Sequence, residues 1–332
     1  NLLAIGCYYF NNFSLLNNTL LNIKIRSQTN EFYLIDLLEK YLKEKKIIYY
    51  YSVKKFAHLG IPSQYEDFLS WQKYFVNNQK TKLISNNFLL KENPVVVLAG
   101  GKGLRTSSIV DNKILMKLKN KYFYEIIFDS FKSKNNHIIL NNINLKKEII
   151  YKNLNFIKIP KTNSMLDTIE NSKEYLLKLK NFFLTSCDCV GKFDALDLRK
   201  LITENTPDIV FFGFKFSNLQ KNLSNSHSLI NTSNKLVTDI KVKHKYSNLY
   251  LGHAGYFWIK NGKIFDYLQK FKNSNYYKSL NRESLIDDYF KYLIKGKMVR
   301  ASYIVLEQYI HIGSSTEYQE YIYWQNYFTN KN

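Results

Sequence analysis

An internal repeat constrains the organisation of this chain more than any other feature of its sequence. Four short segments among the first 75 residues recur in the same order near the end of the chain, at offsets of 249, 252, 253 and 253 residues. Four matches that keep their order and their spacing are improbable by chance. The matched segments are residues 6–10 with 255–259, 31–36 with 283–288, 58–60 with 311–313, and 70–75 with 323–328.

The repeat predicts one complete domain that is preceded by part of another. The first copy matches only the end of a longer unit that begins near Pro94, so it lacks a counterpart of residues 94–254. We therefore predict the C-terminal part of a first domain at 1–75, a linker at 76–93 and a complete domain at 94–328. The linker is rich in Asn and Lys, which is typical of an exposed connection.

The composition excludes several classes of protein. Of the 332 residues, 45% are hydrophobic and 16% aromatic, so the chain can bury a large core and is not disordered throughout. Three cysteines are too few for a disulfide scaffold and favour a reducing, cytoplasmic compartment. No apolar run approaches 18 residues, which excludes a membrane-spanning helix. The chain begins with Asn1 rather than Met and shows no signal peptide, so we expect a piece of a longer protein.

The net charge of +21 does not by itself indicate a nucleic-acid-binding protein. The Lys residues are scattered, and the longest basic cluster, residues 43–46, is interrupted by Glu44. Asn, Lys, Ile, Tyr and Phe are abundant along the whole chain, and this background composition explains most of the charge. We expect no nucleic-acid partner, and the sequence leaves open whether the chain forms a homo-oligomer.

Alternating apolar segments predict an α/β domain for the complete unit. Residues 95–98 are four consecutive β-formers between Pro94 and a glycine-rich turn, a pattern typical of a buried strand in a parallel sheet. Helices are expected at 122–131 and 165–179, where apolar residues recur at helical spacing. The predicted fold is three-layered, Rossmann-like, and built on a mainly parallel sheet. Further strands are expected at 137–140, 156–159, 182–185 and 209–214.

The glycine-rich turn after the first strand is suited to bind an anion. Gly100, Gly101 and Gly103 let backbone N–H groups approach a phosphate closely, and Arg105 and Lys113 add positive charge. The turn is neither a Walker A loop nor a dinucleotide fingerprint. Ligands of such sheets bind at the carboxyl ends of the strands, where a second polar segment, residues 186–188, is also expected.

These residues resemble the signature of the sugar-phosphate nucleotidylyltransferases. Residues 96–105 (Val-Val-Leu-Ala-Gly-Gly-Lys-Gly-Leu-Arg) and 112–118 (Asn-Lys-Ile-Leu-Met-Lys-Leu) are similar to its Leu-Ala-Gly-Gly-x-Gly-x-Arg and Pro-Lys-x-Leu motifs, with Asn112 in place of proline. The resemblance implies that Arg105 and Lys113 are catalytic. It also implies that the nucleotide is bound by Leu98, Ala99, Gly100, Gly101 and Gly103.

Three later segments extend the resemblance in the expected order. It implies that Asp188 binds a catalytic Mg²⁺ and that Glu283 binds the hydroxyls of the sugar. His311 stands where the family has a second aspartate ligand, and His58 stands there in the first copy. Imidazole is a poor ligand for Mg²⁺, so this substitution weakens the case for a two-carboxylate metal site in which His311 would be the second ligand.

The implied reaction joins an NTP to a sugar 1-phosphate and gives an NDP-sugar and pyrophosphate, for surface polysaccharide synthesis. The implied partners are an NTP and a phosphorylated small molecule, and the implied cofactor is Mg²⁺. Two alternatives remain open. The acceptor could be a non-sugar phosphate such as choline phosphate, used by a cytidylyltransferase, or the domain could bind nucleotides without turning them over.

Ordinary structural roles remain open for each of these side chains. Asp188 could cap a helix, Lys113 and Glu283 could face solvent, and His311 could be a core histidine. The Cys187 and Cys189 pair is read as two buried structural thiols rather than a metal site. The aromatic residues of the segment 318–328 have helical spacing and are expected to pack rather than to stack on a ligand.

Overall fold

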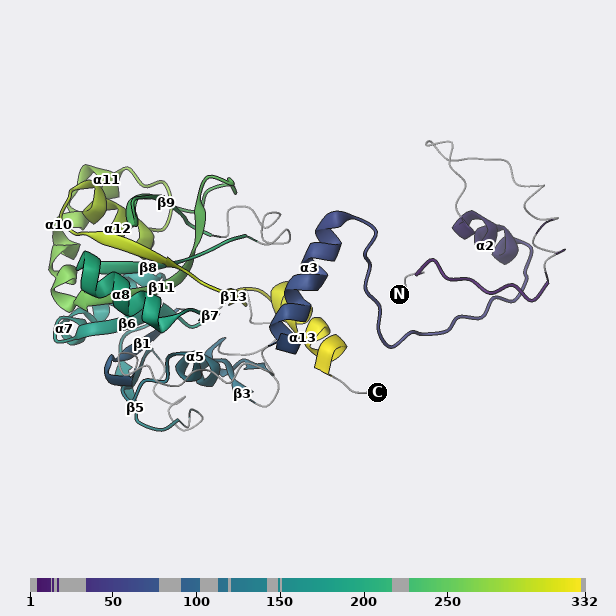
Figure 1. The fold of residues 1–332 in the computed structure, drawn as a ribbon, viewed down its shortest axis with the longest axis horizontal. Helices are drawn as coiled ribbons and strands as arrows, with labels where there is room; N and C mark the ends of the chain where they lie inside the picture. Colours follow the sequence, from purple (N-terminus) through teal and green to yellow (C-terminus); the bar gives the residue numbers. More distant parts are fainter. Residues whose placement is uncertain are drawn as a thin grey trace. The chain divides into compact units, whose positions relative to one another are not determined.

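The computed structural model describes residues 5–12, 14, 17, 34–77, 91–101, 113–118, 121–141, 149, 151–216 and 227–329 (Figure 1). Two compact units are present, Asn1–His58 and Leu59–Asn332. In the first unit, helix α2 (Leu34–Lys43) is amphipathic and buries Leu37 and Tyr41. The predicted site residues Gly103 and Arg105, and the repeat segment at 31–33, lie outside the described residues.

The second unit is built on a mixed β-sheet. Four neighbouring strands run parallel, in the order β5-β4-β1-β6, and β11 lies antiparallel between β6 and β8. Because β9 also pairs with β11, the strands β11, β8, β12, β10 and β9 close into a ring. The strands are β1 (Val95–Ala99), β4 (Asn136–Leu140), β5 (Leu154–Lys158), β6 (Lys180–Ser186), β8 (Ile209–Phe214), β9 (Leu229–Ser233), β10 (Leu236–Lys241), β11 (Leu251–Asn261) and β12 (Ala301–Val305).

The prediction of an α/β fold is confirmed, whereas the predicted mainly parallel, three-layered arrangement is corrected to a mixed sheet, part of which closes into a ring. Every strand that the apolar runs predicted is present, as β1, β4, β5, β6 and β8. However, β11 is antiparallel to both of its long neighbours, and β9 and β10 form an antiparallel hairpin. An apolar run predicts that a strand is buried but not its direction, because direction depends on the connections between strands.

Helices cover both faces of the sheet. Alternate residues of β1 point to opposite faces, so Val95 and Val97 join one core cluster and Val96 and Leu98 join the other. This two-sided burial explains why β1 is a continuous apolar run. The first cluster includes α5 (Phe123–Phe131) and α8 (Ala195–Asn205), and the second includes α6 (Met165–Asn171), α7 (Lys173–Leu176), the 3₁₀ helix η5 (Gly262–Tyr267), α10 (Leu268–Lys272) and α12 (Ile286–Lys295).

The helix expected at 165–179 is shorter than predicted and is interrupted at Ser172. The Ser172 hydroxyl donates to the carbonyl of Thr168, which also accepts the Ser172 amide at 3.1 Å. The chain continues as α7, which ends at Leu176. Three further short elements are η3 (Lys113–Leu115), α11 (Asn275–Lys278) and a small hairpin of β2 (Lys117–Leu118) with β3 (Lys121–Tyr122).

A second, two-stranded sheet and three helical segments complete this unit. Strand β13 (Gln308–His311) pairs antiparallel with β7 (Cys189–Lys192) and leads into α13 (Ser315–Thr329). The segment α3 (Pro62–Gln72), with the π-helical turn η1 (Lys73–Asn77), belongs to the same compact unit, although the repeat assigns it to the first copy. The domain boundaries at 75 and 93 remain predictions. None of the helices that the structure describes is long and apolar enough to cross a membrane.

A glycine in the left-handed region marks an irregularity in β11. The pairing of β11 with β8 shifts register between His253 and Phe257, and Gly255 lies in this interval with φ of +73°. A Cβ at Gly255 would also lie 3.0 Å from the Ser186 hydroxyl. Glycine is therefore favoured here for two reasons: it adopts this backbone conformation without strain, and it has no Cβ that would crowd Ser186.

We predict that Gly255→Ala lowers the free energy of unfolding by about 1–2 kcal/mol, because a side chain is strained at this φ. Denaturant unfolding measures the change. Gly101→Ala is the control, since a Cβ at Gly101 meets nothing within 4 Å, and it should cost less than about 0.5 kcal/mol. Equal losses in the two variants would contradict the assignment of strain to Gly255.

Candidate functional site

The glycine-rich turn and Asp188 lie at the same edge of the sheet. Strand β1 ends at Ala99 and is followed by Gly100 and Gly101, whereas β6 ends at Ser186, two residues before Asp188. The two strands are parallel neighbours, with Leu98 paired to Ser186. The carboxyl ends of β1 and β6 therefore bring these segments together, which is where an open α/β sheet binds its ligands.

Lys113 forms an ion pair with Asp188 across 75 positions of the sequence. The Lys113 Nζ atom, in η3, lies 2.7 Å from Asp188 Oδ2, and the two side chains are only 11% and 17% exposed. Burial by itself would raise the pKa of the Asp188 carboxyl. The charges of Lys113 and His311 outweigh this effect and hold the pKa well below its usual range, so Asp188 is a carboxylate.

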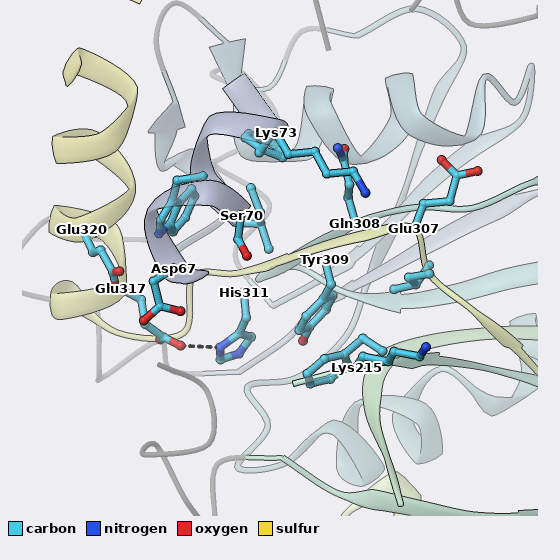
Figure 2. A pocket seen from close by; sticks show the side chains of 15 residues that line it. Asp67, Ser70, Lys73, Lys215, Glu307, Gln308, Tyr309, His311, Glu317 and Glu320 are labelled. Atoms are coloured by element: carbon cyan, nitrogen blue, oxygen red, sulfur yellow. Dashed lines mark hydrogen bonds and ion pairs between the residues drawn. The ribbon is translucent and has the colours of Figure 1, made fainter. Parts of the chain in front are cut away.

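The small sheet places His311 beside the same carboxylate. Cys189 is paired with His311 in the β7–β13 register, and the Ile312 amide donates to the Asp188 carbonyl at 2.8 Å. As a result, His311 Nε2 lies 3.6 Å from Asp188 Oδ2. On the other side of the ring, Nδ1 lies 2.7 Å from Glu317 Oε1, as Figure 2 shows.

His311 is a cation held between two carboxylates. Burial would lower its pKa, but hydrogen bonds and charge from Asp188 and Glu317 raise the pKa to about 9. The Glu317 carboxylate is itself oriented by the Gly313 amide and the Ser314 hydroxyl, which donate to its Oε2. A protonated ring has no lone pair to offer a metal ion. In this arrangement both ring nitrogens of His311 face carboxylates, and whether His311 binds a metal ion stays a prediction.

Gly313 leaves room for the imidazole. A Cβ at Gly313 would collide with the ring of His311, so only glycine allows the ring to lie over the backbone at this position. The His-x-Gly pattern, which is repeated at His58 and Gly60 in the first copy, thus has a packing explanation in the second copy.

The predicted nucleotide-binding residues have different environments. Leu98 and Ala99 are buried in β1. A Cβ at Gly100 would lie within 3 Å of the hydroxyls of Thr162 and Thr168, so packing requires glycine there. Gly101 is exposed and open, as a residue that approaches a ligand through its backbone must be.

Glu283 lies on the surface just before α12, whereas the other acid of its motif is buried. Asp288 accepts two hydrogen bonds from the Arg282 guanidinium, at 2.7 and 2.8 Å, and one from the Leu285 amide at the start of α12. Asp288 therefore fixes the N-terminus of α12. The structure does not bring Glu283 into a contact with Lys113, Asp188 or His311.

Two groups near the site were missed by sequence reasoning. His227 packs edge-on against His311 with ring centroids 4.9 Å apart, and burial together with the charge of His311 lowers the pKa of His227 to about 3. His253 Nδ1 lies 3.0 Å from Asp287 Oδ1, and Ser228 donates to the other oxygen of Asp287. The only sequence signal was indirect: His253 lies two residues before the repeated Gly255.

The predicted burial of the two cysteines beside Asp188 is confirmed for Cys189 alone. Cys189 is buried, Cys187 is half-buried, and neither forms a disulfide. Burial raises the pKa of Cys187 to about 11 and the pKa of Cys189 further, so both remain protonated near neutral pH. They fill space around the ion pair and are not poised as nucleophiles or as metal ligands.

A cavity of about 310 Å³ is lined by His311 and Glu317 (Figure 2). Its lining comes from α3, η1, β8, β13, α13 and the residues next to them, and it includes neither Lys113, Asp188 nor Gly100. Acidic side chains outnumber the lysines in its lining, so it is not suited to a triphosphate. The acids are Asp67, Glu307, Glu317 and Glu320, and the lysines are Lys73 and Lys215.

One carboxylate is available for a metal ion. Among the residues that the structure describes, no group of three His, Cys, Asp or Glu side chains is arranged to hold one. Lys113 and His311 both approach Oδ2 of Asp188, and none of the described residues donates a hydrogen bond to Oδ1. A magnesium ion that also binds substrate phosphates needs no more than one or two carboxylates, so Asp188 fits this use.

Comparison with solved structures identifies the fold. The chain matches a nucleoside-diphosphate-sugar pyrophosphorylase from Vibrio cholerae RC9 (TM-score 0.53, 14% identity, 69% of this chain and 99% of that one). It also matches an inositol-1-phosphate CTP transferase from T. maritima (TM-score 0.53, 14% identity, 73% and 98%). The sequence matches no family model, and a search of curated proteins finds no similar sequence. The shared fold is thus that of nucleotidyltransferases.

We predict that His311 makes stability depend on pH between about 6.5 and 9. Its pKa is raised in the folded state, so its contribution is complete below about 6.5 and is lost as the pH rises through about 9. The difference in unfolding free energy between the parent and His311→Gln should therefore shrink by up to about 1.4 kcal/mol per pH unit over this range. Denaturant unfolding in EDTA measures it.

The exposed His244 provides the control for this experiment. His244→Gln should change the free energy of unfolding by less than about 0.5 kcal/mol, because the His244 ring lies on the surface. A constant difference between the parent and His311→Gln from pH 6.5 to 9 would show that His311 is neutral in the folded protein.

Proposed function

We propose that this chain transfers a nucleotidyl group from an NTP to a sugar 1-phosphate, which gives an NDP-sugar and pyrophosphate. The observation that carries the proposal is the buried Lys113–Asp188 ion pair beside Gly100 and Gly101, at the carboxyl edge of β1 and β6. The fold shared with nucleotidyltransferases supports the same reaction. Lys113 and Asp188 are also the two described residues on which the motif resemblance places the chemistry.

The reaction needs positioning and charge neutralisation rather than a protein nucleophile. A phosphate oxygen of the acceptor attacks the α-phosphorus, the bond from the α-phosphorus to its bridging oxygen breaks, and pyrophosphate leaves. Lys113 supplies a cation at this edge and would turn from Asp188 towards the α-phosphate when the nucleotide binds. Gly101 offers an open backbone for the phosphates, and Arg105 is assigned to them from the motif alone.

Asp188 is the residue that would hold a Mg²⁺ ion, through the carboxylate oxygen that accepts no hydrogen bond from the described residues. When bound, the metal would neutralise charge on the phosphates of the substrate. His311 would add a second fixed cation behind Asp188, in place of a second carboxylate ligand. Lys113, His311 and one metal ion would then together neutralise the negative charge of Asp188 and of the substrate phosphates.

The acceptor is proposed from its chemistry. The structural neighbours are named for a nucleoside-diphosphate sugar and for inositol 1-phosphate, both of which place a phosphate on a cyclic polyol. A sugar 1-phosphate is the acceptor of this kind that the motif favours, with Glu283 as the residue assigned to its hydroxyls. The product would serve surface polysaccharide synthesis. A cytidylyltransferase that uses choline phosphate would differ only in this acceptor site.

A second candidate is a module that binds nucleotides without turnover. The observation in its favour is that both nitrogens of His311 face carboxylates, at the position where the motif resemblance implies a second metal-binding aspartate. A domain that has exchanged a metal ligand for a fixed cation could retain NTP binding and lose catalysis. The two candidates differ in one measurable outcome, which is the release of pyrophosphate.

We predict pyrophosphate release with at least one pair of NTP and sugar 1-phosphate in the presence of Mg²⁺. Lys113→Ala should lower kcat by on the order of 100-fold and change KM for the NTP much less, because its charge acts on the reacting phosphate. Asp188→Asn should abolish metal-dependent turnover, with circular dichroism as the check on folding. The exposed Lys200 gives the control, and Lys200→Ala should leave kcat and KM unchanged.

The outcomes separate the candidates. Absence of turnover with every pair tested, together with measurable NTP binding, would reject catalysis and favour the binding module. Turnover with CTP and choline phosphate, but with no sugar 1-phosphate, would reassign the acceptor. If Lys113→Ala weakened NTP binding as much as it lowered kcat, Lys113 would hold the ground-state nucleotide rather than stabilise the transition state.

A further inference from the structure

Helices α3 and α13 occupy equivalent positions in the two copies of the repeat. At the offset of 253 residues, residues 63–75 align with 316–328 without a gap. Five of the aligned positions are identical, and most of the others carry chemically similar residues, such as Asp67 and Glu320 or Phe68 and Tyr321. The identical pairs are Tyr65 and Tyr318, Trp71 and Trp324, Gln72 and Gln325, Tyr74 and Tyr327, and Phe75 and Phe328.

These two equivalent helices pack against each other. Figure 1 shows α3 crossing α13 beside the small β7–β13 sheet, and the two helices meet through aromatic rings. Phe68 of α3 lies against three rings of α13, and Tyr321 of α13 lies against three rings of α3 and η1. Phe68 and Tyr321 are themselves equivalent in the repeat.

The contacts occur in reciprocal pairs. Phe68 lies 5.8 Å from Trp324, between ring centroids, at an interplanar angle of 71°. When each residue is replaced by its equivalent in the other copy, this contact becomes Trp71 with Tyr321. Their ring centroids lie 6.0 Å apart, at an interplanar angle of 75°. Exchange of the two copies thus reproduces this contact in both distance and orientation, which an arbitrary packing of two helices would not do.

The other contacts between the helices follow the same rule. Phe68 with Phe328 (5.3 Å, 49°) corresponds to Phe75 with Tyr321 (5.4 Å, 59°). Phe68 with Tyr327 (5.9 Å, 88°) corresponds to Tyr74 with Tyr321 (6.2 Å, 71°). Phe75 and Phe328 are equivalent to each other, so exchange of the copies leaves their contact (6.2 Å) unchanged. This contact therefore lies at the centre of the interface. Every aromatic contact between α13 and the segment 62–77 that the structure describes has its reciprocal partner.

Local geometry agrees with this equivalence. Within each helical segment, Trp71 stacks on Phe75 at 5.8 Å and 16°, and Trp324 stacks on Phe328 at 5.8 Å and 22°. Outside the helices, the repeat pairs Gly6 with Gly255, and these are the glycines with positive φ in the described part of the chain, at 78° and 73°. Equivalent positions thus share backbone and side-chain conformations.

We propose that α3 and α13 form an isologous interface, in which the two copies of the repeat join through the same surface around a local twofold axis. In such an interface residue i contacts residue j and the equivalent of j contacts the equivalent of i, which is the pattern of the aromatic contacts here. The partner that fits α13 is therefore the equivalent helix of a second copy. In this chain the first copy supplies that helix as a built-in partner.

The interface has a consequence for the cavity beside His311. Helix α3 and η1 supply one wall of it, through Asp67, Trp71 and Tyr74, whereas α13 supplies Glu317 and Glu320. The second copy therefore has a cavity that the first copy completes. This inference does not depend on nucleotidyl transfer, because it rests on the repeat and on the packing of the two helices.

An exchange of sequence between the helices tests the proposal in the full chain. Residues 63–75 are replaced by the sequence of 316–328, which changes the side chains but keeps the aromatic face. An isologous interface accepts its own partner sequence, so Tm should stay within about 5 °C of the parent. In the matched control, the inserted sequence is shifted by two positions, which turns the aromatic face by about 200°. This control should lose about 10 °C or more.

Equal losses of Tm in the exchanged and shifted chains would overturn the proposal. Double-mutant cycles provide a second measurement with fewer substitutions. Phe68→Ala with Trp324→Ala, and Trp71→Ala with Tyr321→Ala, should show the same coupling, about 2- to 10-fold in the unfolding equilibrium constant. Coupling in one pair without coupling in the other would show that the contacts are not symmetry-related.

Discussion

The arrangement of the candidate site depends on how one buried carboxylate is balanced. Asp188 lies between Lys113 and His311, and His311 in turn lies between Asp188 and Glu317. Charges that are removed from water are tolerated only when they are paired and hydrogen-bonded, and the loss of one partner of such a pair typically costs about 3–5 kcal/mol. The chain of alternating charges from Lys113 to Glu317 satisfies that condition and links η3, the turn between β6 and β7, β13 and α13.

This network places an imidazole, rather than a second carboxylate, beside Asp188. A second carboxylate beside Asp188 would require a metal ion to offset the repulsion between them. The imidazolium of His311 removes that repulsion within the protein, and Glu317, Ser314 and Gly313 keep the ring in place. The site is consequently charge-balanced without a metal, and the proposed metal would bind to a single carboxylate together with the phosphates of a substrate.

Much of the fold could be predicted because burial on both faces leaves a clear pattern. The apolar runs at 95–98 and 209–214 correspond to β1 and β8, and the glycine turn and Asp188 lie at the same sheet edge, as their positions after strands predicted. The direction of β11 could not be predicted, because it depends on connections rather than on composition. The helix after Met165 was predicted too long, because the spacing of its apolar residues does not show the interruption at Ser172 or the end of α7 at Leu176.

The sequence by itself determined the repeat, the buried strands, and the identity of the residues that carry charge at the strand ends. Only the tertiary structure decided that Lys113 pairs with Asp188, that His311 lies between Asp188 and Glu317, and that α3 packs against α13. The physical reason is the range of the interactions. Apolar periodicity and turn chemistry act over a few residues, whereas a pKa and a helix interface depend on groups that the fold brings together from positions up to about 250 residues apart.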